Sequence, residues 1–214
     1  MKRSYLIIGS LVIVAACSFG FLFINHTPED ILDKSEYLKW IENEDNGFKN
    51  VITEGPLVYE VTYCPIDYMI AREFRTPQIN RKQFLKRSEE LRGLNYFKLR
   101  MKRKNSNNEI LAYNLSGGQQ EYYKRVDYLS YGLEEDIFLL QNDFSDTLKP
   151  ALFHFERTYG VAPYIDFLVA FKADSSNKYE HKVFVLDDKV FGSGVMRFDF
   201  NTNTIKNSPK LLVK

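Results

Sequence analysis

Residues 96–104 read Tyr-Phe-Lys-Leu-Arg-Met-Lys-Arg-Lys, and this alternation of apolar and basic side chains predicts a half-buried β-strand. Side chains two residues apart point to the same face of a strand. The apolar face consists of Phe97, Leu99 and Met101. The opposite face carries Lys98, Arg100 and Lys102. A strand of this kind is typical of an antiparallel sheet that packs one face on a core and turns the other to solvent.

The rest of the chain predicts helices mainly in the first half and strands mainly in the second. Apolar spacing indicates helices at residues 28–44, 66–74 and 77–93. Alternating or apolar runs indicate strands at residues 57–63, 137–140, 151–157, 164–171, 181–186, 195–200, 204–206 and 211–213. Residues 105–120 are polar and favour a loop, and residues 122–131 fit either a helix or a strand. Because no β-α-β alternation is visible, we expect an α+β fold. N-terminal helices precede a mainly antiparallel sheet in a single globular domain, residues 28–214.

Composition excludes several classes of protein. Of 214 residues, 44% are hydrophobic and 27% are charged, so the chain is neither disordered nor fibrous. The formal net charge is +1, which gives no overall field toward nucleic acid. Two cysteines exclude a disulfide-rich scaffold and an all-cysteine zinc site. The second cysteine, Cys64, follows a predicted strand, and we expect it to be a small buried side chain.

The N-terminus has the features of an export signal. Residues 1–3 include two cations, residues 5–16 are mostly apolar, and residues 14–18 read Val-Ala-Ala-Cys-Ser. This last stretch resembles a bacterial lipobox. The resemblance implies that residues 1–16 are a lipoprotein signal peptide, that Cys17 receives fatty acyl chains such as palmitate, and that residues 17–27 form a tether. Several acyl chains hold a protein on a bilayer far better than one.

A second interpretation of the same segment remains open. The residues after Cys17 are still apolar, so residues 5–24 form an uncharged stretch long enough to cross a bilayer as one helix. Lys2 and Arg3 would then stay in the cytoplasm. Both interpretations place residues 28–214 outside the cytoplasm, in the periplasm or at the cell surface. We therefore expect a membrane-anchored protein of the cell envelope.

The lipobox, the aromatic-rich body and the segment 37–47 together resemble lipoproteins of Bacteroidota. The segment reads Tyr-Leu-Lys-Trp-Ile-Glu-Asn before Asn46-Gly47. The resemblance implies a module anchored in the inner or outer membrane, and it implies no defined activity.

No motif indicates catalysis, a metal or a cofactor. Residues 115–120, Leu-Ser-Gly-Gly-Gln-Gln, match the signature of ABC-transporter ATPases, but the chain has no G-x-x-x-x-G-K-[ST] loop, so we expect no nucleotide. His154 and Glu156 lie two residues apart, which is too few ligands for a metal site. We therefore expect no metal, no cofactor and no catalytic residue.

Charge is distributed unevenly along the chain. Residues 29–54 contain eight acids and three lysines, whereas residues 81–104 contain ten basic residues and two acids. The simplest interpretation is a solvated helix and an outer strand face. A sharper one is a surface for an anionic partner, formed by Lys98, Arg100, Lys102, Arg103 and Lys104.

These observations predict a non-catalytic binding or assembly module that contacts other envelope proteins. One alternative is an envelope hydrolase that uses acids such as Asp187 or Glu156. Another is an accessory protein of the inner membrane, held by the helix 5–24 instead of by lipid.

Overall fold

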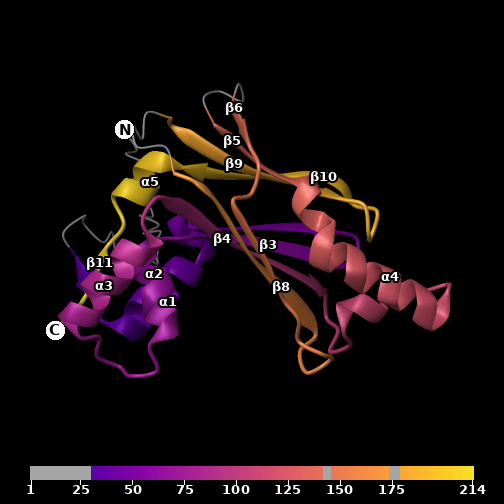
Figure 1. The fold of residues 1–214 in the computed structure, drawn as a ribbon, viewed down its shortest axis with the longest axis horizontal. Coiled ribbons are helices and arrows are strands. Elements are labelled where there is room, and N and C mark those ends of the chain that lie inside the picture. Colours follow the sequence, from indigo (N-terminus) through magenta and orange to yellow (C-terminus); the bar gives the residue numbers. More distant parts are fainter. Residues whose placement is uncertain (1–29, 142–145, 174–178) are drawn as a thin grey trace, which may run out of the picture.

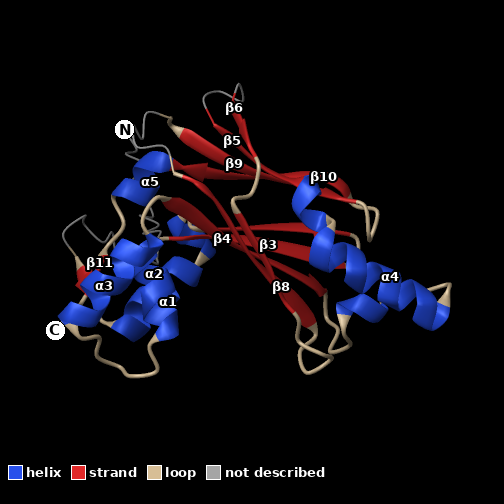
Figure 2. Cartoon of the chain, viewed as in Figure 1, coloured by secondary structure: helices blue, strands red, loops and turns tan. Residues whose placement is uncertain are grey.

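The computed structural model describes residues 30–141, 146–173 and 179–214. It is a mixed fold of helices and mainly antiparallel sheets, which confirms that part of the prediction (Figure 2). The predicted signal peptide 1–16, the alternative membrane helix 5–24, the tether 17–27 and the lipidation site Cys17 lie outside the described residues. Within those residues, no helix is long and apolar enough to cross a bilayer.

Two antiparallel sheets form the body. The five-stranded sheet has the order β2-β3-β4-β8-β7, with bounds Lys49–Glu54, Leu57–Cys64, Leu94–Arg103, Tyr164–Lys172 and Leu152–Glu156. The four-stranded sheet has the order β10-β9-β5-β6, with bounds Gly194–Asn201, His181–Asp188, Ile137–Gln141 and Asp146–Leu148. The two sheets pack face to face around an aromatic core. In it, the Phe97 ring lies 5.8 Å from Phe171 and 5.4 Å from Phe184, measured between ring centroids.

The helices cover opposite ends of this sandwich (Figure 1). At one end lie α1, α2 and α3, with bounds Lys34–Glu42, Ile66–Glu73 and Arg81–Leu91. They form a second core against the five-stranded sheet. This core includes Tyr37, Tyr68 and Tyr96. At the other end lies α4, Gly118–Tyr131, whose Leu129 is fully buried in the first core. Short 3-10 turns occupy Glu44–Asn46, Ile110–Ala112 and Leu133–Asp136.

The two ends of the described chain pair with each other. Strand β1, Ile31–Leu32, lies parallel to β11, Lys210–Leu211. The Lys210 amide donates to the Asp30 carbonyl over 2.9 Å, and the Arg81 amide at the start of α3 donates to the Lys214 carbonyl over 2.7 Å. Residue 30, the C-terminal strand and α3 are therefore neighbours.

Several predicted boundaries are wrong because asparagine and aspartate caps decide them. The first helix begins at Lys34 and not at residue 28, since the Asp33 carboxylate accepts from the Glu36 amide over 2.9 Å and caps it there. The predicted strand 204–206 is instead the helix α5, Thr202–Lys206, capped by Asn201. One further boundary is wrong without such a cap, because α4 begins at Gly118, inside the predicted loop 105–120, and has no side-chain cap. The segment 122–131, for which helix and strand were both open, is helical.

Candidate functional site

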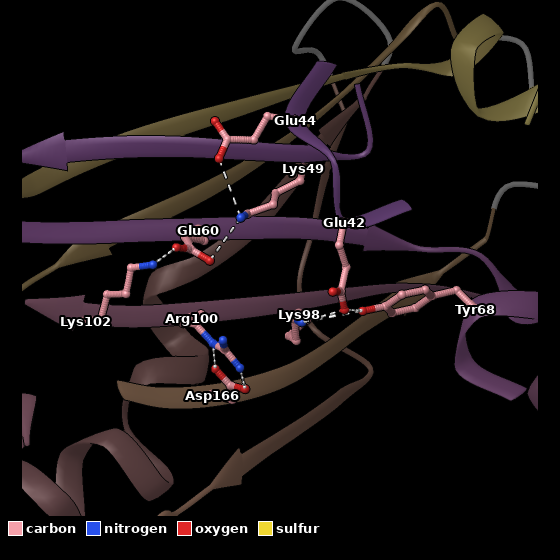
Figure 3. Close-up of polar contacts among 9 residues, drawn as sticks. All are labelled: Glu42, Glu44, Lys49, Glu60, Tyr68, Lys98, Arg100, Lys102 and Asp166. Carbon is pink, nitrogen blue, oxygen red and sulfur yellow. Dashed lines mark hydrogen bonds and ion pairs between the residues drawn. The ribbon is translucent and has the colours of Figure 1, made fainter. Parts of the chain in front are cut away.

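The alternation in β4 is present as predicted. Phe97, Leu99 and Met101 are fully buried between the sheets. Lys98, Arg100 and Lys102 lie on the other face of the five-stranded sheet, called here the outer face (Figure 3). The remaining two predicted surface residues do not share this face. Arg103 points the opposite way and lies 4.9 Å above the Tyr113 ring, and Lys104 follows the end of the strand.

Arg100 is the most firmly held cation of the outer face. Its guanidinium donates two hydrogen bonds of 2.7 Å each to the Asp166 carboxylate, which lies directly opposite on β8. It also lies 3.6 Å above the Tyr164 ring centre, a cation-π contact. Burial alone would lower the pKa of Arg100, but the Asp166 hydrogen bonds outweigh burial and raise this pKa above its ordinary value. Arg100 is thus permanently charged and fixed in one orientation.

A second group of charges runs across β2, β3 and β4. Glu60 forms ion pairs with Lys102 and, over 3.4 Å, with Lys49, which also lies 3.6 Å from Glu44. Burial would raise the pKa of Glu60, yet the two lysines outweigh it and lower this pKa below its usual range. Four side chains from three neighbouring strands and the adjoining turn therefore form one continuous network (Figure 3).

The third group joins the sheet to the helices. Lys98 lies 3.9 Å from the Glu42 carboxylate at the end of α1, and the Tyr68 hydroxyl of α2 donates to the same carboxylate over 2.7 Å. Burial lowers the pKa of Lys98, and the nearby Arg72 lowers it further. The ammonium form of Lys98 is therefore disfavoured by its burial.

The whole set is called here the charge ladder. Its charged members are Glu42, Glu44, Lys49, Glu60, Lys98, Arg100, Lys102 and Asp166. It contains four cations and four carboxylates, so it is electrically balanced. Lys98, Arg100 and Lys102 therefore belong to a pattern of alternating charge and do not form a row of bare cations.

A cavity of about 260 Å³ lies beside the ladder, between α2, β4 and β7. Its lining residues are Cys64, Met69, Arg72, Glu73, Lys98, Glu156 and Leu168. Cys64 is buried, as predicted, and its thiol donates to the Thr62 carbonyl over 3.4 Å. Burial raises the pKa of Cys64 to about 12, so this thiol stays protonated at neutral pH and is a poor nucleophile.

The other residues considered in the sequence are spread over the molecule. His154 and Glu156 are exposed on the outer face of β7, whereas Asp187 lies in β9 of the second sheet, 3.9 Å from Lys189. In the part of the chain that the structure describes, no group of three or more His, Cys, Asp or Glu side chains could hold a metal ion.

The stretch that matches the ABC signature leads into α4. There the Glu121 carboxylate accepts from the backbone amides of Ser116, over 2.9 Å, and Gly117, over 2.6 Å. Those amides would contact a phosphate in an ATPase, and here a carboxylate of the same chain already engages them.

The acidic half of the ladder is what the sequence analysis missed. Asp166 is the one polar residue in the apolar run 164–171, and an acid in such a run indicates a cation opposite it. Glu60 likewise interrupts the strand 57–63. No comparable pattern singled out Glu42 or Tyr68, which reach the sheet only through helix packing.

Comparisons with protein-family models, with curated proteins and with solved structures found no match. A function for this chain therefore has to come from its own geometry.

Proposed function

We propose that this protein is a membrane-anchored component of the bacterial cell envelope, and that its body is a non-catalytic binding or assembly module. The outer face of the five-stranded sheet is its contact surface. One observation carries this proposal, namely that the outer face, the end of α1 and the adjoining 3-10 turn hold eight charged side chains in a balanced set of ion pairs. The most accessible of these side chains are Lys102, Glu42 and Glu44.

The balance of charge favours a protein partner over a bare polyanion. A polyanion would have to displace carboxylates that are already paired with the cations, such as Asp166 on Arg100. A protein surface with its own alternating charges can instead contact the accessible side-chain atoms of each ion pair without breaking the pair. Electrostatic complementarity of this kind contributes chiefly to specificity and to the rate of association.

The geometry of the chain suits a short attachment to a membrane. The described chain starts at residue 30, at the end of the molecule that carries α1, α2 and α3 (Figure 1). If Cys17 is acylated, residues 17–29 can span about 45 Å at full extension. The body would then work within that distance of the bilayer, with α4 at the far end.

The attachment is tested by the intact mass of the full chain, produced in a bacterium with a lipoprotein pathway. We expect a wild-type mass that begins at Cys17 and includes acyl chains, and an unacylated Cys17→Ser variant. A mass that retains residues 1–16 without acyl chains would favour the accessory protein held by the helix 5–24. Recovery of the protein outside the membrane fraction would overturn both kinds of attachment.

The contact surface is tested by photo-crosslinking in the envelope from two exposed positions. Thr53 of β2 lies on the outer face beside the charge ladder, and Arg197 on β10 is the matched control on the opposite side of the sandwich. We expect one defined adduct from position 53 and none from 197.

The exchange Arg100→Asp with Asp166→Arg keeps a pair between β4 and β8 but reverses its direction. We expect this exchange to remove the adduct formed from position 53, and an unchanged adduct would contradict the proposal.

The hydrolase alternative has one observation in its favour. Glu156 and Glu73 line the same cavity with Arg72 and Lys98, so two carboxylates and two cations share one pocket. If this pocket were catalytic, Glu156→Gln would abolish a hydrolytic activity that Asp187→Asn leaves intact. Equal activity of the two variants on envelope glycan and peptide substrates would remove this alternative.

A further inference from the structure

A second charged surface lies at the end of the molecule where the described chain begins, over β1, β11 and α3 (Figure 1). In the last residues of the chain, Lys210, Leu212 and Lys214 are exposed. Leu211 between them is buried, as expected when alternate residues face opposite ways. Ile31 lies beside Lys210 in the parallel pair and is 60% exposed. Two cations and two aliphatic side chains therefore face outward together.

The start of α3 continues this surface. The Arg81 amide donates to the Lys214 carbonyl over 2.7 Å, so the first turn of the helix adjoins the end of the chain. Leu85 lies one helical turn beyond Arg81 and is 56% exposed, and Lys82 is exposed beside it. The surface is called here the basic face, and it consists of Ile31, Arg81, Lys82, Leu85, Lys210, Leu212 and Lys214.

The cations of the basic face have no carboxylate partner. In the part of the chain that the structure describes, no ion pair involves Arg81, Lys82, Lys210 or Lys214. Further along α3, Glu89 and Glu90 are held by Arg92 and Arg87 over 2.7 Å each. In the charge ladder, by contrast, every cation already lies beside a carboxylate. The basic face can therefore attract an external anion without breaking an ion pair of the protein.

The aliphatic side chains favour a lipid surface over a soluble polyanion. Ile31, Leu85 and Leu212 are 60%, 56% and 42% exposed, beside the cations. A soluble polyanion offers no apolar environment to such side chains. A bilayer with anionic headgroups suits both kinds of residue, because the cations contact phosphates while the aliphatic side chains enter the boundary between headgroups and acyl chains.

The basic face is also where a membrane anchor would join the body. The Asp30 carbonyl accepts from the Lys210 amide over 2.9 Å, so the described chain begins at the edge of this face. An anchor that precedes residue 30 would hold the face close to the bilayer. The contact would then be intramolecular in effect, and even a weakly attractive surface would be occupied.

We propose that the basic face contacts the anionic headgroups of the bilayer to which the chain is attached, with β1, β11 and α3 against the membrane and α4 pointing away from it. This inference rests on the proposed membrane attachment and adds a second contact, made by the folded body. The second contact fixes how the body is oriented on the membrane.

The test is fluorescence quenching in vesicles that contain brominated lipids, on the full chain purified from membranes. A fluorescent amino acid replaces Leu85 or, as the matched control, Tyr123 on α4, which is also 56% exposed. In vesicles containing phosphatidylglycerol, we expect quenching at position 85 and none at position 123. In vesicles of phosphatidylcholine alone, or at high salt, quenching at position 85 should fall at least about threefold, because the attraction to headgroups is absent or screened.

Charge variants separate the basic face from the net charge of the protein. Lys82→Glu with Lys210→Glu reverses two cations of the face. Lys124→Glu with Arg197→Glu makes the same change in net charge at exposed positions of α4 and β10. With phosphatidylglycerol present, we expect the first variant to lower quenching at position 85 at least about threefold and the second to leave it unchanged.

Flotation of the vesicles reports the attachment separately from the docking. Protein that floats with neither kind of vesicle would overturn the attachment and the docking together. Protein that floats, but is not quenched at position 85 or is quenched equally at positions 85 and 123, would overturn the docking alone. Equal quenching of wild type and of the variant with Lys82→Glu and Lys210→Glu would also overturn it.

Discussion

The two faces of β4 are built from alternate residues of one strand, yet different interactions stabilise them: apolar burial on one face and ion pairs on the other. The inner face buries Phe97, Leu99 and Met101 completely, in contact with the opposite sheet. The outer face carries Lys98, Arg100 and Lys102, each paired with a carboxylate from another element. Burial of apolar surface is non-directional and contributes a large free energy. Partly buried ion pairs contribute little net free energy, because desolvation offsets their attraction, but they require one geometry.

This difference indicates that the two faces of a single strand have different roles. The inner face provides most of the stability, and the outer face provides a surface with a defined pattern. The comparison predicts that neighbouring residues of β4 differ sharply in what their replacement does.

The largest effect is expected inside. Leu99→Ala removes a fully buried side chain from the middle of the sandwich and leaves a cavity, so we expect the free energy of unfolding to fall by about 2–5 kcal/mol. Chemical denaturation measures this. Thr53→Val, on an exposed position of the neighbouring sheet edge, should stay within about 0.5 kcal/mol of wild type. A loss below about 1 kcal/mol for Leu99→Ala would mean that the two sheets do not pack as described.

A smaller effect is expected from breaking the strongest outer pair. Asp166→Leu leaves the Arg100 guanidinium half-buried without its carboxylate, and we expect a loss of about 1–3 kcal/mol. The double variant Arg100→Met with Asp166→Leu removes both charges and should recover to within about 1 kcal/mol of wild type. Additive losses in this double-mutant cycle would show that the pair does not interact.

The network around Glu60 should appear in the pH dependence of stability. Lys102 and Lys49 lower the pKa of Glu60 in the folded state, so its contribution is present above the unfolded pKa of about 4.3 and is lost as pH falls through the lower folded value. We expect Glu60→Gln to be less stable than wild type at pH 7 by up to about 1 kcal/mol. The difference should disappear in acid. A difference that persists at pH 2 would assign the effect to packing and not to charge.

The smallest effect is expected at Lys98, the direct neighbour of Leu99. Burial lowers the pKa of Lys98, so its charged form is disfavoured, and Lys98→Met should change stability by less than about 0.5 kcal/mol or raise it. Thermal unfolding at pH 7 measures this beside Leu99→Ala. If Lys98→Met lowered stability as much as Leu99→Ala does, the two faces of β4 would not differ in their contribution to stability.

The sequence predicted the central strands well because their alternation is local, but it missed β1, β2 and β6 and predicted a strand where α5 lies. Residues 57–63, 96–104, 181–186 and 195–200 all fall within observed strands or within one residue of them. The mainly antiparallel pairing of the strands was also predicted, because helices and strands do not alternate along the chain. Helix ends were predicted less well, because a single side chain such as Asp33 or Asn201 decides where the backbone turns.

Only the basic residues of the candidate site could be predicted from the sequence, and its carboxylates could not. The basic residues of β4 were visible because they follow one another along the chain. Their carboxylates come from β3, β8 and α1, and the Arg100–Asp166 pair joins residues 66 positions apart. The burial of the polar residues Asn95 and Thr202 was not predicted at all. Neither residue type is unusual in its segment until the opposite sheet is in place.

The parallel pairing of β1 with β11 has a mechanical consequence. Any force carried by an anchor at the start of the chain enters the body at residue 30 and loads two backbone hydrogen bonds, Lys210 to Asp30 and Leu212 to Leu32. Because the strands run parallel and Lys214 is tied to Ile79 and Arg81, this load acts on both bonds together in shear. Residues 210–214 therefore hold residues 30–32 against the body. If residues 210–214 were removed, the residues before α1 would be released, and the distance between an anchor and the body could increase by their length.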